Sequence, residues 1–181
     1  MTRIHVTGNA GSGKTTFARR LGELLDEPVF GLDEVVWRPG WQKAPVEERR
    51  AREIELVQQP NWIIEGVSPI VRQAAEVIIL LDVVRLVALG RCAKRNWRYL
   101  LRSRPGLPQD CPEWKIVPRL CRLIWRFPEH VQPEILAEGC RRDLMFRHVK
   151  TWPEQEEVLA ELRHVAAPPE HLTHYKTHDT G

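Results

Sequence analysis

The sequence lacks the features of membrane, metal-cluster and disulfide-stapled proteins. No apolar run reaches the eighteen residues of a membrane-spanning helix, and the N-terminus enters a strand-like segment without a signal-like stretch. Four cysteines lie far apart, and their spacing contains no C-x-x-C pair: Cys92, Cys111, Cys121 and Cys140. We therefore expect a soluble, cytoplasmic protein with reduced thiols and no membrane partner.

Acidic residues are scarce in one part of the chain. Between Arg85 and Arg126 there are eleven Lys and Arg but only two acids, so this basic segment carries a net charge of +9. The whole chain has a net charge of +3, so the remaining residues together carry −6. Such an asymmetry indicates where an anionic ligand would be held. With 181 residues, the chain is long enough for one full core. We expect a single domain over 1–167, a basic lid over about 91–126, and a disordered tail over 168–181.

A phosphate-binding motif is present near the N-terminus. Residues 8–15 read GNAGSGKT and match G-x-x-x-x-G-K-[ST], after a strand-like run at 3–7 and before a helical pattern at 14–25. Glycines let the backbone wrap around an anion, with Lys14 reaching the β and γ phosphates and the Thr15 hydroxyl binding Mg²⁺. The alternative is a glycine-rich turn that binds nothing. The residues expected to hold the nucleotide are Gly8, Asn9, Ala10, Gly11, Ser12, Gly13, Lys14, Thr15 and Thr16.

The rest of the sequence alternates between strand and helix patterns. Strands are predicted at 3–7, 28–33, 62–66, 77–82 and 144–149, and helices at 14–25, 47–59, 70–75, 85–102, 113–126, 133–141 and 153–164. Because the strand runs are apolar on both faces, they indicate a parallel sheet. The predicted fold is α/β, a three-layer αβα P-loop domain with a five-stranded parallel sheet and a helical basic insertion.

Three acids follow predicted strands. Asp33, Glu65 and Asp82 would share the carboxyl edge of the sheet with Gly8, where ligands of such sheets bind. Asp33 would orient or deprotonate an acceptor hydroxyl, and Glu65 would hold a magnesium-bound water. Each acid also has a structural interpretation: a helix N-cap for Asp33, a salt bridge for Glu65, and a cap of the next helix for Asp82.

These motifs together resemble the adenylate kinase-like group of P-loop small-molecule kinases over most of residues 1–163. Within that group the sequence is most similar to bacterial proteins labelled DNA topology modulation proteins, which share the opening motif and segments like 32–41 and 62–66. The resemblance implies an ATP-dependent phosphotransferase that uses Mg²⁺. It does not name the phosphoryl acceptor.

The resemblance also implies roles for individual residues. Arg91 and Arg95 match the two lid arginines, four residues apart, that contact the ATP base and phosphates in adenylate kinases. Glu65 and Gly66 are similar to the family's Asp-Gly at the end of the third strand. The chain has Pro69 where the family has an acceptor-gripping arginine, so Arg38 or Arg72 would have to replace it. Trp37 and Trp41 would form an aromatic wall for the acceptor, or one of them would pack in the core.

Two functions remain open on these residues. The first is a kinase that moves the γ-phosphate of ATP to a nucleoside, a nucleotide or another hydroxyl-bearing metabolite. The second is a nucleotide-dependent nucleic-acid-binding protein. It is indicated by four aromatic residues among the lysines and arginines of the basic segment: Trp97, Tyr99, Trp114 and Trp125. Acids at three strand ends favour the kinase, because they repel a nucleic-acid backbone. A plain NTPase is the weakest interpretation, and the oligomeric state stays open.

Overall fold

The computed structural model describes residues 2–99, 110–141 and 143–166. Its first half contains β1 (Arg3–Gly8), α1 (Lys14–Leu25), β2 (Val29–Gly31), α2 (Leu32–Val36), β3 (Trp37–Arg38), η1 (Pro39–Trp41), β4 (Gln42–Lys43), α3 (Val46–Val57), β5 (Trp62–Glu65) and α4 (Pro69–Ala74). Its second half contains β6 (Val77–Leu81), α5 (Arg85–Arg98), η2 (Glu113–Lys115), α6 (Val117–His130), α7 (Gln132–Glu138), β7 (Met145–Val149) and α8 (Trp152–Ala166).

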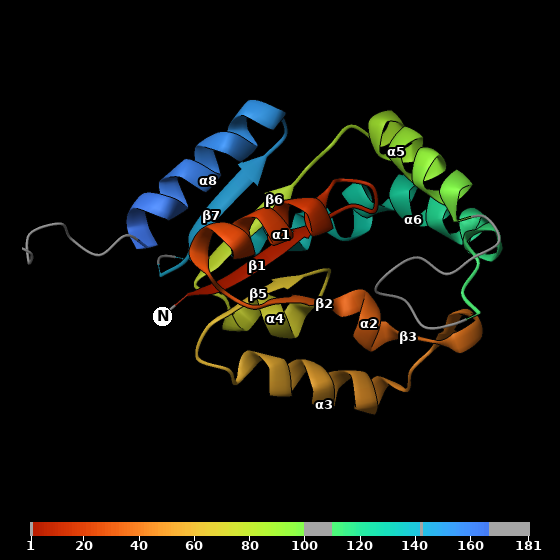
Figure 1. Ribbon diagram of the computed structural model, residues 1–181, viewed down its shortest axis with the longest axis horizontal. Coiled ribbons are helices and arrows are strands. Elements are labelled where there is room, and N and C mark those ends of the chain that lie inside the picture. Colours follow the sequence, from red (N-terminus) through yellow and green to blue (C-terminus); the bar gives the residue numbers. More distant parts are fainter. Residues whose placement is uncertain (1, 100–109, 142, 167–181) are drawn as a thin grey trace, which may run out of the picture.

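Five strands form one parallel sheet in the order β2-β5-β1-β6-β7 (Figure 1). The central strand β1 pairs with β5 on one side and with β6 on the other, with Val6 beside Glu65 and Gly8 beside Leu81. Every connection between neighbouring parallel strands needs a crossover, and helices supply it here. The predicted αβα fold with five parallel strands is confirmed.

Both faces of the sheet are buried, because successive side chains of a strand point to opposite sides. On one face Ile4, Ile63 and Ile79 pack in a cluster with side chains of α1 and α8. On the other face Ile64 and Ile78 pack with side chains of α3, α4, α6 and α7. Figure 1 shows α1 and α8 on one side of the sheet, α3 and α4 on the other, and α5 beside α6 at one end. The apolar strand runs of the sequence are therefore explained by double-sided burial.

Some predicted boundaries differ from the structure. The strand predicted at 28–33 ends at Gly31, and Leu32–Val36 form the short helix α2. The residues that follow form a small antiparallel hairpin, in which Trp37 pairs with Lys43 and Arg38 with Gln42. The helix predicted at 113–126 is two elements: η2 covers 113–115, and α6 begins at Val117 with Pro118 in its first turn, where the missing N–H leaves no helical bond unmade. The predicted tail at 168–181 and part of the expected lid, 100–109, lie outside the described residues.

Within the described ranges, no helix is both long enough and apolar enough to cross a membrane.

A substitution at Gly66 tests how β5 passes into the following segment. Gly66 has φ +141°, and a Cβ there would lie 2.7 Å from the Cβ of Leu32. We expect Gly66→Ala to lower the free energy of unfolding by about 2 to 3 kcal/mol, from backbone strain plus the displaced Leu32. Urea denaturation measures this loss.

Gly40→Ala is the matched control. Gly40 also has a positive φ, +74°, but no described atom lies within 4 Å of a Cβ built there. It should cost only about 1 kcal/mol, from the backbone alone. Equal losses in the two variants would contradict a steric role for Leu32.

Candidate active site

The loop between β1 and α1 folds back on itself in a tight turn. Gly8, Gly11 and Gly13 have positive φ angles, which glycine adopts without strain. The Ser12 N–H donates to the Asn9 carbonyl at 3.2 Å, and α1 begins directly after Gly13. The N–H groups at the start of α1 have no partner within the helix, and the helix dipole adds positive potential. This geometry suits a polyphosphate.

The candidate metal ligands lie together. The Thr15 hydroxyl donates to Glu65 Oε1 at 2.9 Å. This contact follows from the sheet register, because Glu65 ends β5 beside Val6, two residues before the loop begins. A hydroxyl and a carboxylate are hard oxygen ligands of the kind Mg²⁺ takes, with its remaining positions filled by water and phosphate. The residues present therefore fit a magnesium ion bound with a triphosphate.

Lys14 lies among charged groups at the same edge. Its ammonium donates to the Asn9 carbonyl at 3.0 Å. Burial lowers the pKa of Lys14 below its ordinary value and the Arg95 cation adds to this, whereas the carboxylates of Glu65 and Asp33 oppose it. The two carboxylates and the arginine therefore act electrostatically on Lys14. The structure brings four of the residues predicted for phosphoryl transfer into one neighbourhood.

Helix α5 supplies the predicted arginine pair. Arg91 Nη1 donates to the Ser12 carbonyl at 3.3 Å, so this side chain reaches the loop. The Arg95 guanidinium contacts the Asn96 side chain at 3.4 Å and the Cys92 Sγ at 3.9 Å. With Arg91 at the loop and Arg95 acting on Lys14, positive charge from mid-chain is placed where a triphosphate would carry its negative charge.

Gly11 shows how closely α5 approaches the loop. A Cβ at Gly11 would lie 2.9 Å from Cys92 Sγ and would collide with the Ala88 carbonyl. Only a residue without a side chain fits between the loop and this helix. The buried thiol of Cys92 is therefore a wall of the loop, a role that its isolated position in the sequence did not indicate.

The predicted acceptor residues Asp33, Trp37 and Trp41 lie on α2 and the hairpin that follows. Asp33 is exposed in the first turn of α2, whose N-cap is Gly31 and has no side-chain cap bond among the described residues, so the N-cap interpretation of Asp33 is wrong. The Trp37 and Trp41 rings meet edge to face, with centroids 5.2 Å apart. Both are only partly buried, as a binding wall requires.

Residues of the second half of the chain contact both tryptophans of this pair. The Trp41 indole N–H donates to the Pro112 carbonyl at 2.8 Å, and the Arg119 guanidinium lies 5.3 Å from the centroid of the Trp37 ring. Trp41 has φ +60°, a conformation that bulky residues rarely adopt. A backbone held in this way by tertiary contacts is typical of binding sites.

Arg38 and Arg72 have partners away from the loop. Arg38 forms an exposed ion pair with Glu48 of α3. Arg72 is buried, and its Nε lies 3.0 Å from a Glu138 carboxylate oxygen of α7. Arg72 therefore stabilises the packing of α4 on α7, and neither arginine is included in the acceptor site proposed below.

Asp82 does not cap the helix that follows β6. The N-cap of α5 is Val84, and Asp82 Oδ2 instead lies 2.8 Å from both Gln132 Nε2 and His148 Nε2. The sequence could not indicate these partners, because they come from α7 and β7, at least fifty residues away. Asp82 joins the far half of the sheet to α7.

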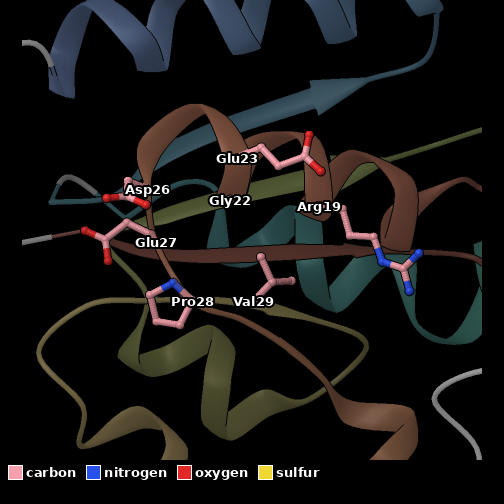
Figure 2. A pocket seen from close by; sticks show the side chains of 7 residues that line it. All are labelled: Arg19, Gly22, Glu23, Asp26, Glu27, Pro28 and Val29. Carbon is pink, nitrogen blue, oxygen red and sulfur yellow. The ribbon is translucent and has the colours of Figure 1, made fainter.

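A surface hollow lies at the other end of α1 (Figure 2). It is lined by Arg19, Glu23, Asp26, Glu27 and neighbouring apolar groups. Helix α1 rises about 1.5 Å per residue, which separates this hollow from the loop by roughly 10 to 15 Å. Three carboxylates against one arginine repel a triphosphate, so we place the candidate site at the loop. Among the described residues, no group of three or more His, Cys, Asp and Glu forms a further metal site.

His5 was not identified from the sequence. It lies on β1, fully buried, and its Nε2 is 3.1 Å from the carbonyl of Gly66, the residue after Glu65. Its Nδ1 has no hydrogen-bond partner among the described residues. A single histidine in an apolar strand gives no signal of this contact, because the register between β1 and β5 creates it.

Comparisons with known proteins support the fold. The structure is similar to shikimate kinase from Acinetobacter baumannii in complex with shikimate, with a TM-score of 0.53, 17% identity, and 91% of this chain and 92% of that chain covered. It is also similar to shikimate kinase from Bacteroides thetaiotaomicron, with a TM-score of 0.53, 16% identity, and coverage of 91% and 97%. A sugar kinase from Janibacter sp. gives a TM-score of 0.51, 18% identity, and coverage of 93% and 100%.

Comparison of the sequence with protein-family models gives no match, and neither does comparison with curated proteins. The structural likeness shows that the chain has the αβα fold of these kinases, with a five-stranded parallel sheet.

The buried His5 predicts a specific acid sensitivity. Burial lowers the pKa of His5 from 6.5 to about 3, and the cations of Arg72 and Lys14 lower it too. The hydrogen bond to the Gly66 carbonyl opposes this shift and raises the pKa. Between pH 6.5 and 3 the unfolded chain therefore binds a proton that the folded protein excludes. Stability falls as the pH falls through this window, by up to about 1.4 kcal/mol per pH unit from His5 alone.

His5→Gln should make this pH dependence shallower, because glutamine keeps a donor for the Gly66 carbonyl and does not titrate. Free energies of unfolding measured from pH 6.5 to 4 by urea denaturation give the slope. His130→Gln, at an exposed histidine of α6, is the control and should keep the slope of the unsubstituted protein. An unchanged slope in His5→Gln would rule out His5 as the source.

Proposed function

We propose that this protein is an ATP-dependent kinase that transfers the γ-phosphate to a hydroxyl group of a small molecule. The observation that carries the proposal is the hydrogen bond between Thr15 and Glu65, placed beside Lys14 at the start of α1. It joins a magnesium-binding pair to a phosphate loop at one edge of the sheet. The names of the structural neighbours, shikimate kinase and sugar kinase, support the same reaction class.

Each residue has a role that follows from its position. The loop N–H groups and Lys14 hold the β and γ phosphates, and Arg91 and Arg95 balance the charge that spreads over the transferred group. Mg²⁺ bound with Thr15 and Glu65 would neutralise the phosphate oxygens. Asp33, exposed in the first turn of α2, accepts the proton of the attacking hydroxyl or orients it in this proposal.

The acceptor binds between α2 and the Trp37–Trp41 pair in this proposal. The aromatic faces and Arg119 suit a ring that carries hydroxyl groups and a negative charge. A sugar acid, a cyclic hydroxy acid, a nucleoside or a nucleotide meets this description in part or in full. Helix α5 of the basic segment covers the phosphates in this proposal, since Arg91 reaches the loop, and helps to exclude water.

A kinase assay with an acceptor panel tests the reaction. Purified protein with ATP and Mg²⁺ should release ADP faster in the presence of at least one sugar, cyclic hydroxy acid, nucleoside or nucleotide than in water alone. The Lys14→Met variant, assayed in parallel, controls for contaminating kinases. If no acceptor accelerates ADP formation, the kinase proposal fails.

Asp33→Asn tests the acceptor side once an acceptor is found. We expect kcat to fall by about 10² to 10⁴, because an amide cannot accept the hydroxyl proton. Affinity for ATP with Mg²⁺ should change little, because Asp33 does not bind the triphosphate in this scheme. Glu34→Gln removes the neighbouring exposed carboxylate of α2 and should keep kcat. Equal rates in the two variants would exclude Asp33 from proton transfer.

A second candidate function is nucleotide-dependent binding of nucleic acid, in keeping with the sequence resemblance to DNA topology modulation proteins. It is favoured by three exposed tryptophan rings in the basic segment, at 97, 114 and 125. The Arg85 guanidinium lies 5.0 Å from the centroid of the Trp125 ring, and Lys115 lies 5.8 Å from that of Trp114. Bases stack on such rings and phosphates bind the cations.

Salt dependence tests this candidate. Binding of a fluorescent single-stranded oligonucleotide should weaken steeply between low and moderate ionic strength, and Trp97→Ala should weaken it further at low salt. Absence of any retention at low salt would eliminate the nucleic-acid function without affecting the kinase proposal.

A further inference from the structure

One carbonyl inside α6 has lost its helical partner. In an α-helix the carbonyl of residue 124 accepts from the N–H of residue 128, and Pro128 has no N–H. Ile124 is fully buried, so water does not readily replace the missing donor. A buried carbonyl without a donor destabilises the folded state.

Asn9 of the phosphate loop supplies the missing donor. Its Nδ2 donates to the Ile124 carbonyl at 2.8 Å in a buried bond. Its Oδ1 accepts from the Ala10 N–H, also at 2.8 Å, so the amide is held at both ends. The Asn9 side chain therefore spans from the first turn of the loop to the proline-containing turn of α6.

The same residue also contacts the groups that would bind phosphate. The backbone carbonyl of Asn9 accepts from the Ser12 N–H and from the Lys14 ammonium, at 3.2 and 3.0 Å. A shift of Asn9 would move both of these contacts. Helix α5 touches the loop only two residues further on, at Gly11, so the loop rests on α5 and α6 together.

We infer that Asn9 is a positioning residue, which sets the conformation of the phosphate loop by donating to the α6 carbonyl that Pro128 leaves unpaired. Pro128 and Asn9 act as a pair: the proline creates the acceptor and the asparagine uses it. The inference rests on the proposed function only in that the loop binds ATP. Neither residue need touch the transferred phosphate or the acceptor.

A double-mutant cycle on stability tests the pairing. Asn9→Ala should lower the equilibrium constant for folding about tenfold, because it leaves the Ile124 carbonyl unpaired. In the Pro128→Ala background the alanine N–H satisfies that carbonyl, so the same Asn9→Ala change should cost about threefold or less. Equal costs in the two backgrounds would overturn the pairing. Pro128→Ala itself improves helix propensity, so this arm of the cycle is expected to fold.

Nucleotide affinity tests the positioning role. Binding of the β,γ-imido analogue of ATP with Mg²⁺ is measured by calorimetry, well below the melting temperature of each variant. Asn9→Ala should weaken this binding about tenfold, because the loop loses its anchor. Asn61→Ala is the matched control: it removes one side-chain bond, to the Thr2 N–H, at the opposite edge of the sheet, and should keep the affinity.

The outcomes separate this inference from the proposed function. If Asn9→Ala loses stability but keeps the affinity, the bond is only structural and the positioning role is overturned. If the unsubstituted protein binds no ATP analogue in the calorimetric experiment, the proposed function fails. The double-mutant cycle on stability still reports whether Asn9 and Pro128 are coupled. Weaker binding in Asn9→Ala together with coupled stability supports the inference.

Discussion

The register of β1 between β5 and β6 is the constraint on which the site depends. It sets Val6 beside Glu65 and Gly8 beside Leu81, so the loop leaves the sheet next to the acid that ends β5. From this one alignment follow the contact between Thr15 and Glu65 and the charged surroundings of Lys14. A slip by one residue would turn every side chain of β1 to the opposite face and separate these groups.

Charge is distributed around this edge in a complementary way. Carboxylates come from β5 and α2, on one side of the loop, and arginines come from α5, on the other. Lys14 lies between them, partly buried, where low dielectric strengthens each interaction. A triphosphate with Mg²⁺ would satisfy both sides at once. This arrangement explains why an acid-poor segment and a group of strand-end acids occur in the same small domain.

Much of the fold could be predicted from the sequence, because the signals are local. The phosphate motif, the apolar strand runs and the glycines each act within a few residues, and the structure confirms the five strands. The roles of Arg72 and Asp82 could not be predicted. Arg72 pairs with Glu138, and Asp82 with Gln132 and His148, so each depends on packing between elements at least fifty residues apart.

The sequence by itself determined that this chain forms a parallel sheet with a phosphate loop, since both depend on short-range backbone preferences and on burial of apolar runs. Only the tertiary structure decided which polar groups meet. The carbonyl freed by Pro128 could have stayed near solvent, and Asn9 could have turned to the ligand. The packing of α6 beneath the loop joined them, because a buried polar group is stable only when it is paired.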